Sequence, residues 1–128
     1  MRLLLDTHAL VWWAISDERL SATARNAIED GSNEINVSAV TAMEICTKVR
    51  LGKFEDARAL SVGFSAQMLQ QGFGLLDLTA DHAERAGSLS ISNKDPFDRL
   101  LIAQAQLEQM TLVSNERQFD DYAVLRLW

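Results

Sequence analysis

Hydrophobic and polar positions along the chain predict short buried strands that alternate with helices. Apolar or alternating runs typical of strands lie at Arg2–Leu5, Glu34–Ser38, Phe73–Leu78, Thr111–Ser114 and Val124–Trp128. Stretches with helical periodicity and helix-start or helix-stop residues lie at His8–Ile15, Ser21–Gly31, Ala39–Leu51, Asp56–Gln71, Thr79–Ser88 and Asp95–Gln109. Without a visible linker or repeat, this alternation predicts a single α/β domain over residues 1–128, with a mainly parallel sheet covered on both faces.

The last of these helices has the best-marked start. Asp95 suits the N-cap, and Pro96, the only proline, suits the first helical position. The apolar residues from Leu100 to Ala105 predict that much of the helix is buried. Asp98 nevertheless lies in the first turn, where an acid either satisfies free N–H groups and the helix dipole or serves a functional site.

Three further acids lie after predicted strands. Asp6 comes directly after the first strand, Glu44 about two turns into the helix after the second, and Glu116 just after Thr111–Ser114. Ligands of open α/β sheets bind in the crevice beyond the carboxyl ends of the strands. We therefore expect the four carboxylates to converge on one edge of the sheet.

Each acid also has a purely structural interpretation. Asp6 is compatible with a turn, Asp95 with an N-cap alone, and Glu116 with a solvated loop. Glu44 lies three residues after Thr41, which fits a capping box if the helix begins there rather than at Ser38. The four placements together are more specific than any one of them.

Four carboxylates in one cleft repel each other, and a cation or a proton must relieve that repulsion. Mg²⁺ and Mn²⁺ prefer oxygen ligands, and such an ion activates water and stabilises charge on a phosphate. The chain has 18 acidic and 12 basic residues, which argues against nucleic-acid binding through a broad basic surface. Two divalent ions would offset the four acids, so an enzyme acting on nucleic acid is still allowed.

Cysteine content and hydropathy give the expected compartment. Cys46 is the only cysteine, so no internal disulfide forms, which fits a reducing cytoplasm. No apolar run approaches 18 residues, and Arg2 and Asp6 interrupt the first one, so neither a membrane span nor a signal peptide is expected.

Four stretches together resemble the PIN-domain ribonucleases, and more narrowly the VapC-type toxins of bacterial type II toxin–antitoxin modules. They are Leu3–Trp13 (LLLDTHALVWW), Ser38–Glu44 (SAVTAME), Lys94–Ala105 (KDPFDRLLIAQA) and Thr111–Phe119 (TLVSNERQF). The resemblance runs nearly end to end. It implies a three-layer α/β/α domain, Mg²⁺- or Mn²⁺-dependent endoribonuclease activity on RNA, a homodimer, and neutralisation by a cognate antitoxin.

The resemblance also assigns residues. It implies that Asp6, Glu44 and Asp98 are the family's first three acids and that Asp95 is an accessory acid. Asp6 and Asp98 are then expected to hold the principal metal, and Glu44 and Glu116 to complete its shell through water or to hold a second ion. The fourth acid is usually aspartate; here it is Glu116, whose extra methylene moves the carboxylate by about a bond length. The hydroxyls of Thr7 and Ser114 either orient water or a ligand carboxylate or cap a helix or turn. Arg99 is a candidate substrate contact because it stands beside Asp98, and relatives often carry histidine where this chain has Asn93.

The remaining polar residues have structural interpretations. His8 is expected to be structural and His82 to be exposed on a helix. Lys48, Arg50 and Lys53 could meet RNA phosphates, but a solvated helix face explains them as a group.

Two other functions are compatible with an acidic α/β protein. One is a PIN domain with weak catalysis that acts mainly as an antitoxin-binding partner, which the substitution at Glu116 motivates. The other is a receiver-like Mg²⁺-binding signalling module, which needs an acidic pair after the first strand. A single Asp6 there disfavours it.

Overall fold

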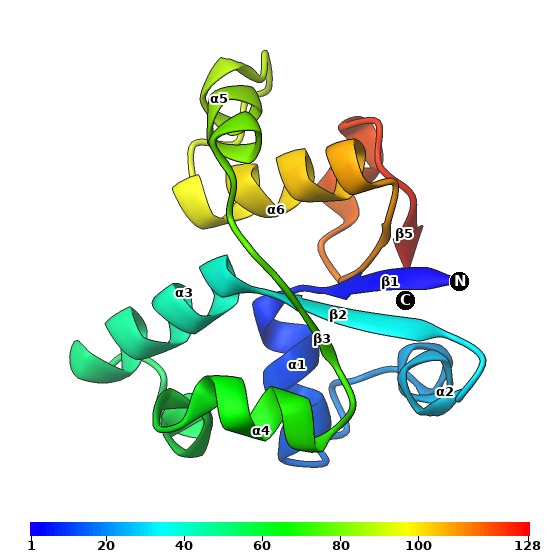
Figure 1. Ribbon diagram of the computed structural model, residues 1–128, viewed down its shortest axis with the longest axis vertical. Helices are drawn as coiled ribbons and strands as arrows, with labels where there is room; N and C mark the ends of the chain where they lie inside the picture. The colour runs from blue at the N-terminus through cyan, green and yellow to red at the C-terminus, as the bar shows by residue number, and fades with distance from the viewer.

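The computed structural model describes residues 1–128, and its centre is one parallel sheet. The strands are β1 (Arg2–Leu5), β2 (Glu34–Ser38), β3 (Gly74–Leu76), β4 (Thr111–Val113) and β5 (Arg126–Leu127). Their order is β3-β2-β1-β4-β5, and every neighbouring pair is parallel. The predicted parallel sheet is confirmed, with β1 at its middle (Figure 1).

Helices cover both faces of the sheet. They are α1 (Thr7–Ala14), α2 (Ala22–Glu29), α3 (Ala39–Arg50), α4 (Phe64–Gln70), α5 (Ala80–Ser88) and α6 (Pro96–Glu108), with short 3₁₀ helices η1 (Glu55–Ser61) and η2 (Arg117–Asp121). In Figure 1, α5 and α6 lie on one side of the sheet, and α1, α2 and α4 lie on the other. The three-layer α/β/α architecture is confirmed.

Side-chain caps start most of these helices where the sequence predicts. The side chains of Ser21, Thr79 and Asp95 each accept a hydrogen bond from a backbone N–H in the first turn of α2, α5 and α6. Pro96 occupies the first position of α6, where its missing N–H costs no hydrogen bond. The start of α6 is therefore fixed firmly enough to orient Asp98.

The helix predicted over Asp56–Gln71 is wrong in one respect: it is two helices. Gly63 has φ +66° and separates η1 from α4, while Val62 before it is extended. A positive φ strains residues that have a Cβ, so glycine is the residue suited to this position. Gly63 was the signal in the sequence, but the surrounding helical periodicity obscured it.

The expectation that His82 is exposed is also wrong. Its side chain is 2% exposed, between α5 and α6. Nδ1 accepts a 3.0 Å hydrogen bond from the Thr79 N–H, so the ring proton lies on Nε2, which donates to Glu108 Oε1 at 2.8 Å. Gln104 also lies within 3.4 Å of Nδ1. These contacts join the two helices of the layer that carries Asp98.

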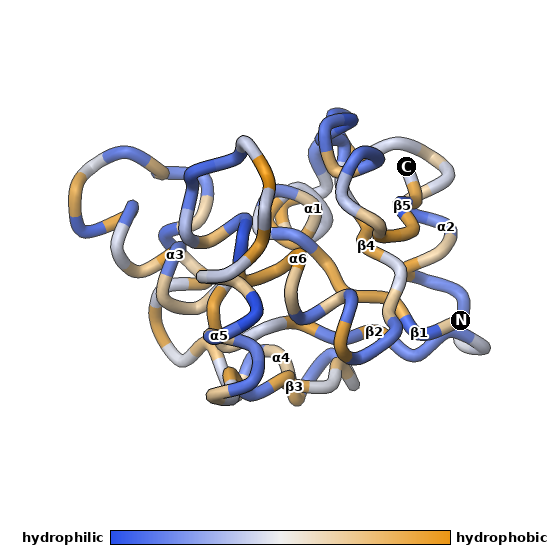
Figure 2. The backbone as a smooth tube through the Cα atoms, turned by 90° about the horizontal axis from the view of Figure 1, so that it is seen from above, coloured by the Kyte–Doolittle hydropathy of each residue, from blue (hydrophilic) through white to orange (hydrophobic).

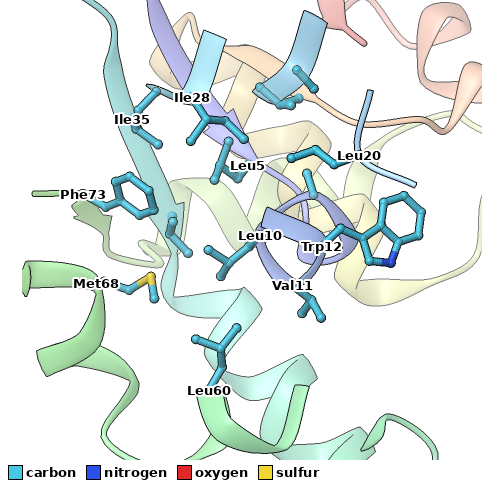
Figure 3. Packing of buried hydrophobic residues seen from close by; sticks show 14 of the residues in the cluster. Leu5, Leu10, Val11, Trp12, Leu20, Ile28, Ile35, Leu60, Met68 and Phe73 are labelled. Atoms are coloured by element: carbon cyan, nitrogen blue, oxygen red, sulfur yellow. The ribbon is translucent and has the colours of Figure 1, made fainter. Parts of the chain in front are cut away.

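Two apolar clusters bury the two faces of the sheet. The larger one joins Leu3 and Leu5 of β1 to α1, α2, α3, η1 and α4. Figure 3 shows Leu10 of α1 near its middle, with Phe73 and Met68 toward one side and Leu60 below. The smaller cluster joins Leu4 of β1 to α6, β4 and η2 on the opposite face. Alternate residues of β1 thus point to opposite sides, as a strand buried on both faces requires.

Polar residues lie mostly on the outer turns. In Figure 2 the chain at β4 is largely hydrophobic, and many of the strongly hydrophilic stretches lie at the periphery. None of the helices has the length and apolarity that crossing a membrane requires.

Candidate functional site

The carboxyl ends of β1, β2 and β4 lie side by side because these strands are parallel neighbours. Asp6 follows β1, α3 with Glu44 follows β2, and Glu116 follows β4. The start of α6 brings Asp98 to the same edge. The order of the strands in the sheet is therefore enough to bring Asp6, Glu44 and Glu116 to one edge.

All five predicted acids line one small cleft of about 110 Å³. The nine residues of this cleft, which we call the acidic cleft, are Asp6, Thr7, His8, Glu44, Lys48, Asp95, Asp98, Leu101 and Glu116. Larger cavities elsewhere are not lined by any comparable group of acids. We regard the acidic cleft as the functional site because its chemistry, rather than its size, sets it apart.

Asp6 is held at the base of the cleft by its role as the N-cap of α1. Its Oδ1 accepts from the Ala9 N–H at 2.8 Å, and it is 6% exposed. Burial raises the pKa of Asp6 to about 7, although hydrogen bonds from Ser114 and Ala9 oppose that shift. The charges of Asp98 and Glu116 raise the pKa further. The hydrogen-bond donors to Asp6 are therefore neutral groups rather than basic side chains.

The pKa of Asp98 is also raised, but less than that of Asp6. Burial raises its pKa to about 6, and the negative charges of Asp95, Glu44 and Glu116 add to the effect. A 3.1 Å hydrogen bond from the Asn93 amide to Oδ2 lowers the pKa in part. Asp95 itself is the N-cap of α6 and accepts from the N–H groups of Phe97 and Asp98. Asp95 therefore has its predicted structural role and also lines the cleft.

Glu44 differs because both of its carboxylate oxygens have partners. Thr7 Oγ1 donates to Oε1 at 2.5 Å, and Lys48 Nζ donates to Oε2. The helix begins at Ser38, whose Oγ accepts from the Val40 N–H. The alternative capping box of Thr41 and Glu44 is therefore wrong, and Glu44 is free to point into the cleft.

The predicted accessory residues fall into two groups. Thr7 and the fully buried Ser114 support the acids, since Thr7 binds Glu44 and Ser114 binds Asp6 and accepts from the Glu116 N–H at 3.0 Å. Arg99 does not line the cleft. Its guanidinium donates to backbone carbonyls from Ala86 to Asn93, so its predicted substrate contact is replaced by a structural role.

Two residues to which the sequence analysis gave structural interpretations, Lys48 and His8, also line the cleft. Lys48 follows Glu44 by one helical turn, and this spacing was the signal that both share a face of α3. His8 lies against Trp12 and Phe54, with ring centroids 5.3 Å from each. Burial, followed by the charge of Lys48, lowers the pKa of His8, so the ring is neutral at pH 7.

The donor set suits a hard divalent cation. The cleft offers carboxylate oxygens, and burial, with a smaller contribution from the neighbouring carboxylates, raises the pKa values of Asp6 and Asp98, a cost that a bound cation would offset. No group of three or more His, Cys, Asp or Glu side chains is already arranged for metal binding. Small side-chain shifts would therefore accompany binding, with Asp6 and Asp98 as the residues that gain most from a positive charge.

Comparison with known proteins identifies the family. The sequence model described as PIN domain matches residues 3–125.

The chain belongs to the PIN domain family. Ribonuclease VapC22 of Mycobacterium tuberculosis is 31% identical over 115 residues, which are 89% of this chain and 86% of that protein. The solved structure of VapC20 of the same organism, described as a sarcin-ricin loop cleaving toxin, has a TM-score of 0.69 at 17% identity and covers 96% of both chains. The structure of VapBC2 from Rickettsia felis, bound to a DNA fragment from its promoter, has a TM-score of 0.67 at 21% identity and covers 98% of this chain and 97% of that chain. The two structural likenesses show that the PIN fold is shared.

Proposed function

We propose that this PIN domain is a divalent-metal-dependent endoribonuclease and the toxin of a type II toxin–antitoxin pair. The observation that carries the proposal is the convergence of Asp6, Glu44, Asp95, Asp98 and Glu116 in one cleft. The ribonuclease relative and the VapC and VapBC structural neighbours support it.

In the mechanism that we propose, Asp6 and Asp98 would hold a Mg²⁺ or Mn²⁺ ion, and Glu116, which lines the same cleft, would add negative charge to the site. A bound divalent ion makes water more acidic and stabilises the extra charge on the scissile phosphate. Ser114 and the Ala9 N–H fix the Asp6 carboxylate, and Asn93 fixes that of Asp98. Thr7 fixes Glu44. The protein thus supplies oriented oxygens, whose orientation requires no reorganisation during the reaction.

The raised pKa values fit this role. A carboxylate with a pKa near 6 or 7 is costly to ionise in the empty cleft, and a cation that binds there removes that cost. Metal affinity should consequently rise with pH, since the ion must displace protons from these acids.

The test is cleavage of RNA by the purified protein with Mg²⁺ or Mn²⁺ and with EDTA, beside Asp6→Asn and Asp98→Asn. We expect metal-dependent cleavage by the wild type and a loss of at least about a hundredfold in each variant. Cleavage at equal rates by the variants, or by the wild type in EDTA, would contradict the proposal. Co-purification with the product of a neighbouring reading frame would test the antitoxin, and sedimentation would test the predicted homodimer.

The receiver-like alternative does not fit the fold. Receiver modules have the strand order 2-1-3-4-5, whereas the order here is β3-β2-β1-β4-β5. The weakly catalytic alternative depends on Glu116 and is addressed by a substitution in the Discussion.

A further inference from the structure

Lys48 is the only lysine or arginine that lines the acidic cleft. It lies four residues after Glu44 on α3, so both side chains leave the helix on the same face. Its ammonium pairs with Glu44 Oε2 and makes no other hydrogen bond. A single positive charge among five carboxylates needs an explanation beyond a solvated helix face.

In the Glu44–Lys48 pair, Glu44 is buried and Lys48 is partly exposed to solvent. The Glu44 side chain is 7% exposed, whereas that of Lys48 is 33% exposed. The hydroxyl of Thr7 donates a hydrogen bond to the other oxygen of Glu44, Oε1, at 2.5 Å. Glu44 is therefore enclosed between Thr7 and Lys48, and the ammonium lies on the side of the pair that is open to solvent.

This arrangement divides the cleft into two electrostatic halves. Asp6 and Asp98 accept hydrogen bonds from neutral groups, the Ala9 N–H and the Asn93 amide, and neither carboxylate forms an ion pair. The charge of Glu44 is instead compensated by Lys48 in direct contact. A divalent ion gains most beside Asp6 and Asp98, and it would have to displace an ammonium to reach Glu44.

An ammonium has three N–H donors, and the contact with Glu44 uses one of them. The remaining donors, at the open side of a cleft that cleaves RNA, suit a non-bridging phosphate oxygen. Resting on the proposed function, we propose that Lys48 binds a phosphate of the RNA and that Glu44 is a positioning residue that holds Lys48 in the cleft. Glu44 is then not a direct ligand of the metal.

The first experiment measures binding of fluorescein-labelled oligouridylate by anisotropy, in EDTA and over a range of salt concentrations. Phosphate contacts do not depend on sequence, so this probe serves although the natural RNA is unknown. We expect Lys48→Met to weaken binding about three- to tenfold at low salt and to reduce the slope of log K against log salt by about 0.7. Lys48→Arg should retain most of the binding because it keeps the charge.

Lys53→Met is the matched control. Lys53 is exposed beyond the end of α3, outside the acidic cleft, and has the same charge. Its substitution should change affinity and slope by less than half as much. Wild-type affinity and slope in Lys48→Met would overturn the assignment of Lys48 to phosphate binding.

The second experiment addresses Glu44. Binding of Mn²⁺ measured by electron paramagnetic resonance should be lost in Asp6→Asn but stay within about threefold of wild type in Glu44→Gln, because the ion would be held by the other half of the cleft. In the Glu44→Gln background, Lys48→Met should change the salt slope less than it does in the wild type, as expected for residues that act together. Loss of Mn²⁺ binding in Glu44→Gln equal to that in Asp6→Asn would overturn the positioning role.

These results are separable from those that test the proposed function. If the wild type fails to cleave RNA with either metal, the proposed function fails. If the wild type cleaves RNA and Lys48→Met still binds oligouridylate normally, only the inference about Lys48 fails.

Discussion

The side-chain amide of Asn93 donates to Oδ2 of Asp98 at 3.1 Å, while its own Oδ1 accepts from the Asp95 N–H at 2.8 Å. One loop residue thereby fixes the N-cap of α6 and the acid in its first turn. The same hydrogen bond lowers the pKa of Asp98, against the burial that raises it.

Removal of this amide should raise the pKa of Asp98 further. In Asn93→Ala we expect a rise of about half to one unit above the wild-type value, because burial then acts without the opposing hydrogen bond. Carboxyl ¹³C NMR titration of the metal-free protein measures it directly. Ser90→Ala, in the same loop but without a side-chain hydrogen bond, is the control; an unshifted Asp98 in Asn93→Ala would refute the role of Asn93.

The metal-free protein should lose stability as pH rises from about 4 to about 7. The pKa values of Asp6 and Asp98 are raised in the folded state, so the fold retains these protons after the unfolded chain has released them. Stability from these acids is therefore complete below the unfolded pKa near 3.8 and declines through the folded pKa values. The acids with lowered pKa values, such as Asp17, act only below this window. Thermal melts in EDTA across the pH range measure the decline.

Asp6→Asn tests whether ionisation of Asp6 causes this loss of stability, because the variant removes the ionisable group. Asparagine caps a helix about as well as aspartate, so α1 is retained while the buried charge is removed. We expect the melting temperature at pH 7.5 in EDTA to rise by about 3 to 8 °C, with little change near pH 4. Added Mg²⁺ should stabilise the wild type but not the variant. The exposed Glu18→Gln serves as control, and an equal Mg²⁺ effect in Asp6→Asn would count against metal binding by Asp6.

Arg99→Lys should destabilise the loop from Gly87 to Asn93 despite conservation of charge. The guanidinium donates to five backbone carbonyls, with distances from 2.6 to 3.5 Å, and an ammonium cannot reproduce that planar array. A loss of about 2 kcal/mol in unfolding free energy is expected from urea melts. Arg85→Lys, whose parent arginine makes one exposed contact, should change stability much less. Equal stability of both variants would show that the loop does not depend on Arg99.

Glu116→Asp should leave the cleavage rate within about threefold of wild type. The charge of Glu116 already raises the pKa of both Asp6 and Asp98, so the glutamate carboxylate is close enough to influence both acids without being shortened. Glu116→Gln should reduce the rate by about tenfold or more, since it removes that charge. A large gain of activity in Glu116→Asp, measured with the same RNA, would instead support the weakly catalytic alternative.

Local signals predicted the elements of this fold well where their physical cause is local. The cap at Asp95, the proline after it and the glycine after α3 act within a few residues, and each has its expected role. The convergence of Asp6 and Glu116 also followed from the sequence, because parallel strands bring their carboxyl ends to one edge of the sheet.

The features that sequence reasoning missed depend on contacts between distant segments. His82 is buried because Glu108 and Gln104 of α6 provide polar partners for it, which nothing near position 82 indicates. Arg99 faces the end of α5 rather than the cleft, although it is the neighbour of Asp98 in sequence. Successive residues on a helix point in different directions, so Arg99 need not face the cleft that Asp98 lines.

The central position of β1 has a consequence for when the acidic cleft is completed during synthesis. Leu3 pairs with Thr111, so the strand that precedes Asp6 stays half unpaired until β4 has left the ribosome. Asp98 and Glu116 are also translated late, and a nascent chain that lacks them has an incomplete set of acids. The acidic cleft is therefore complete only after nearly the whole chain has been synthesised.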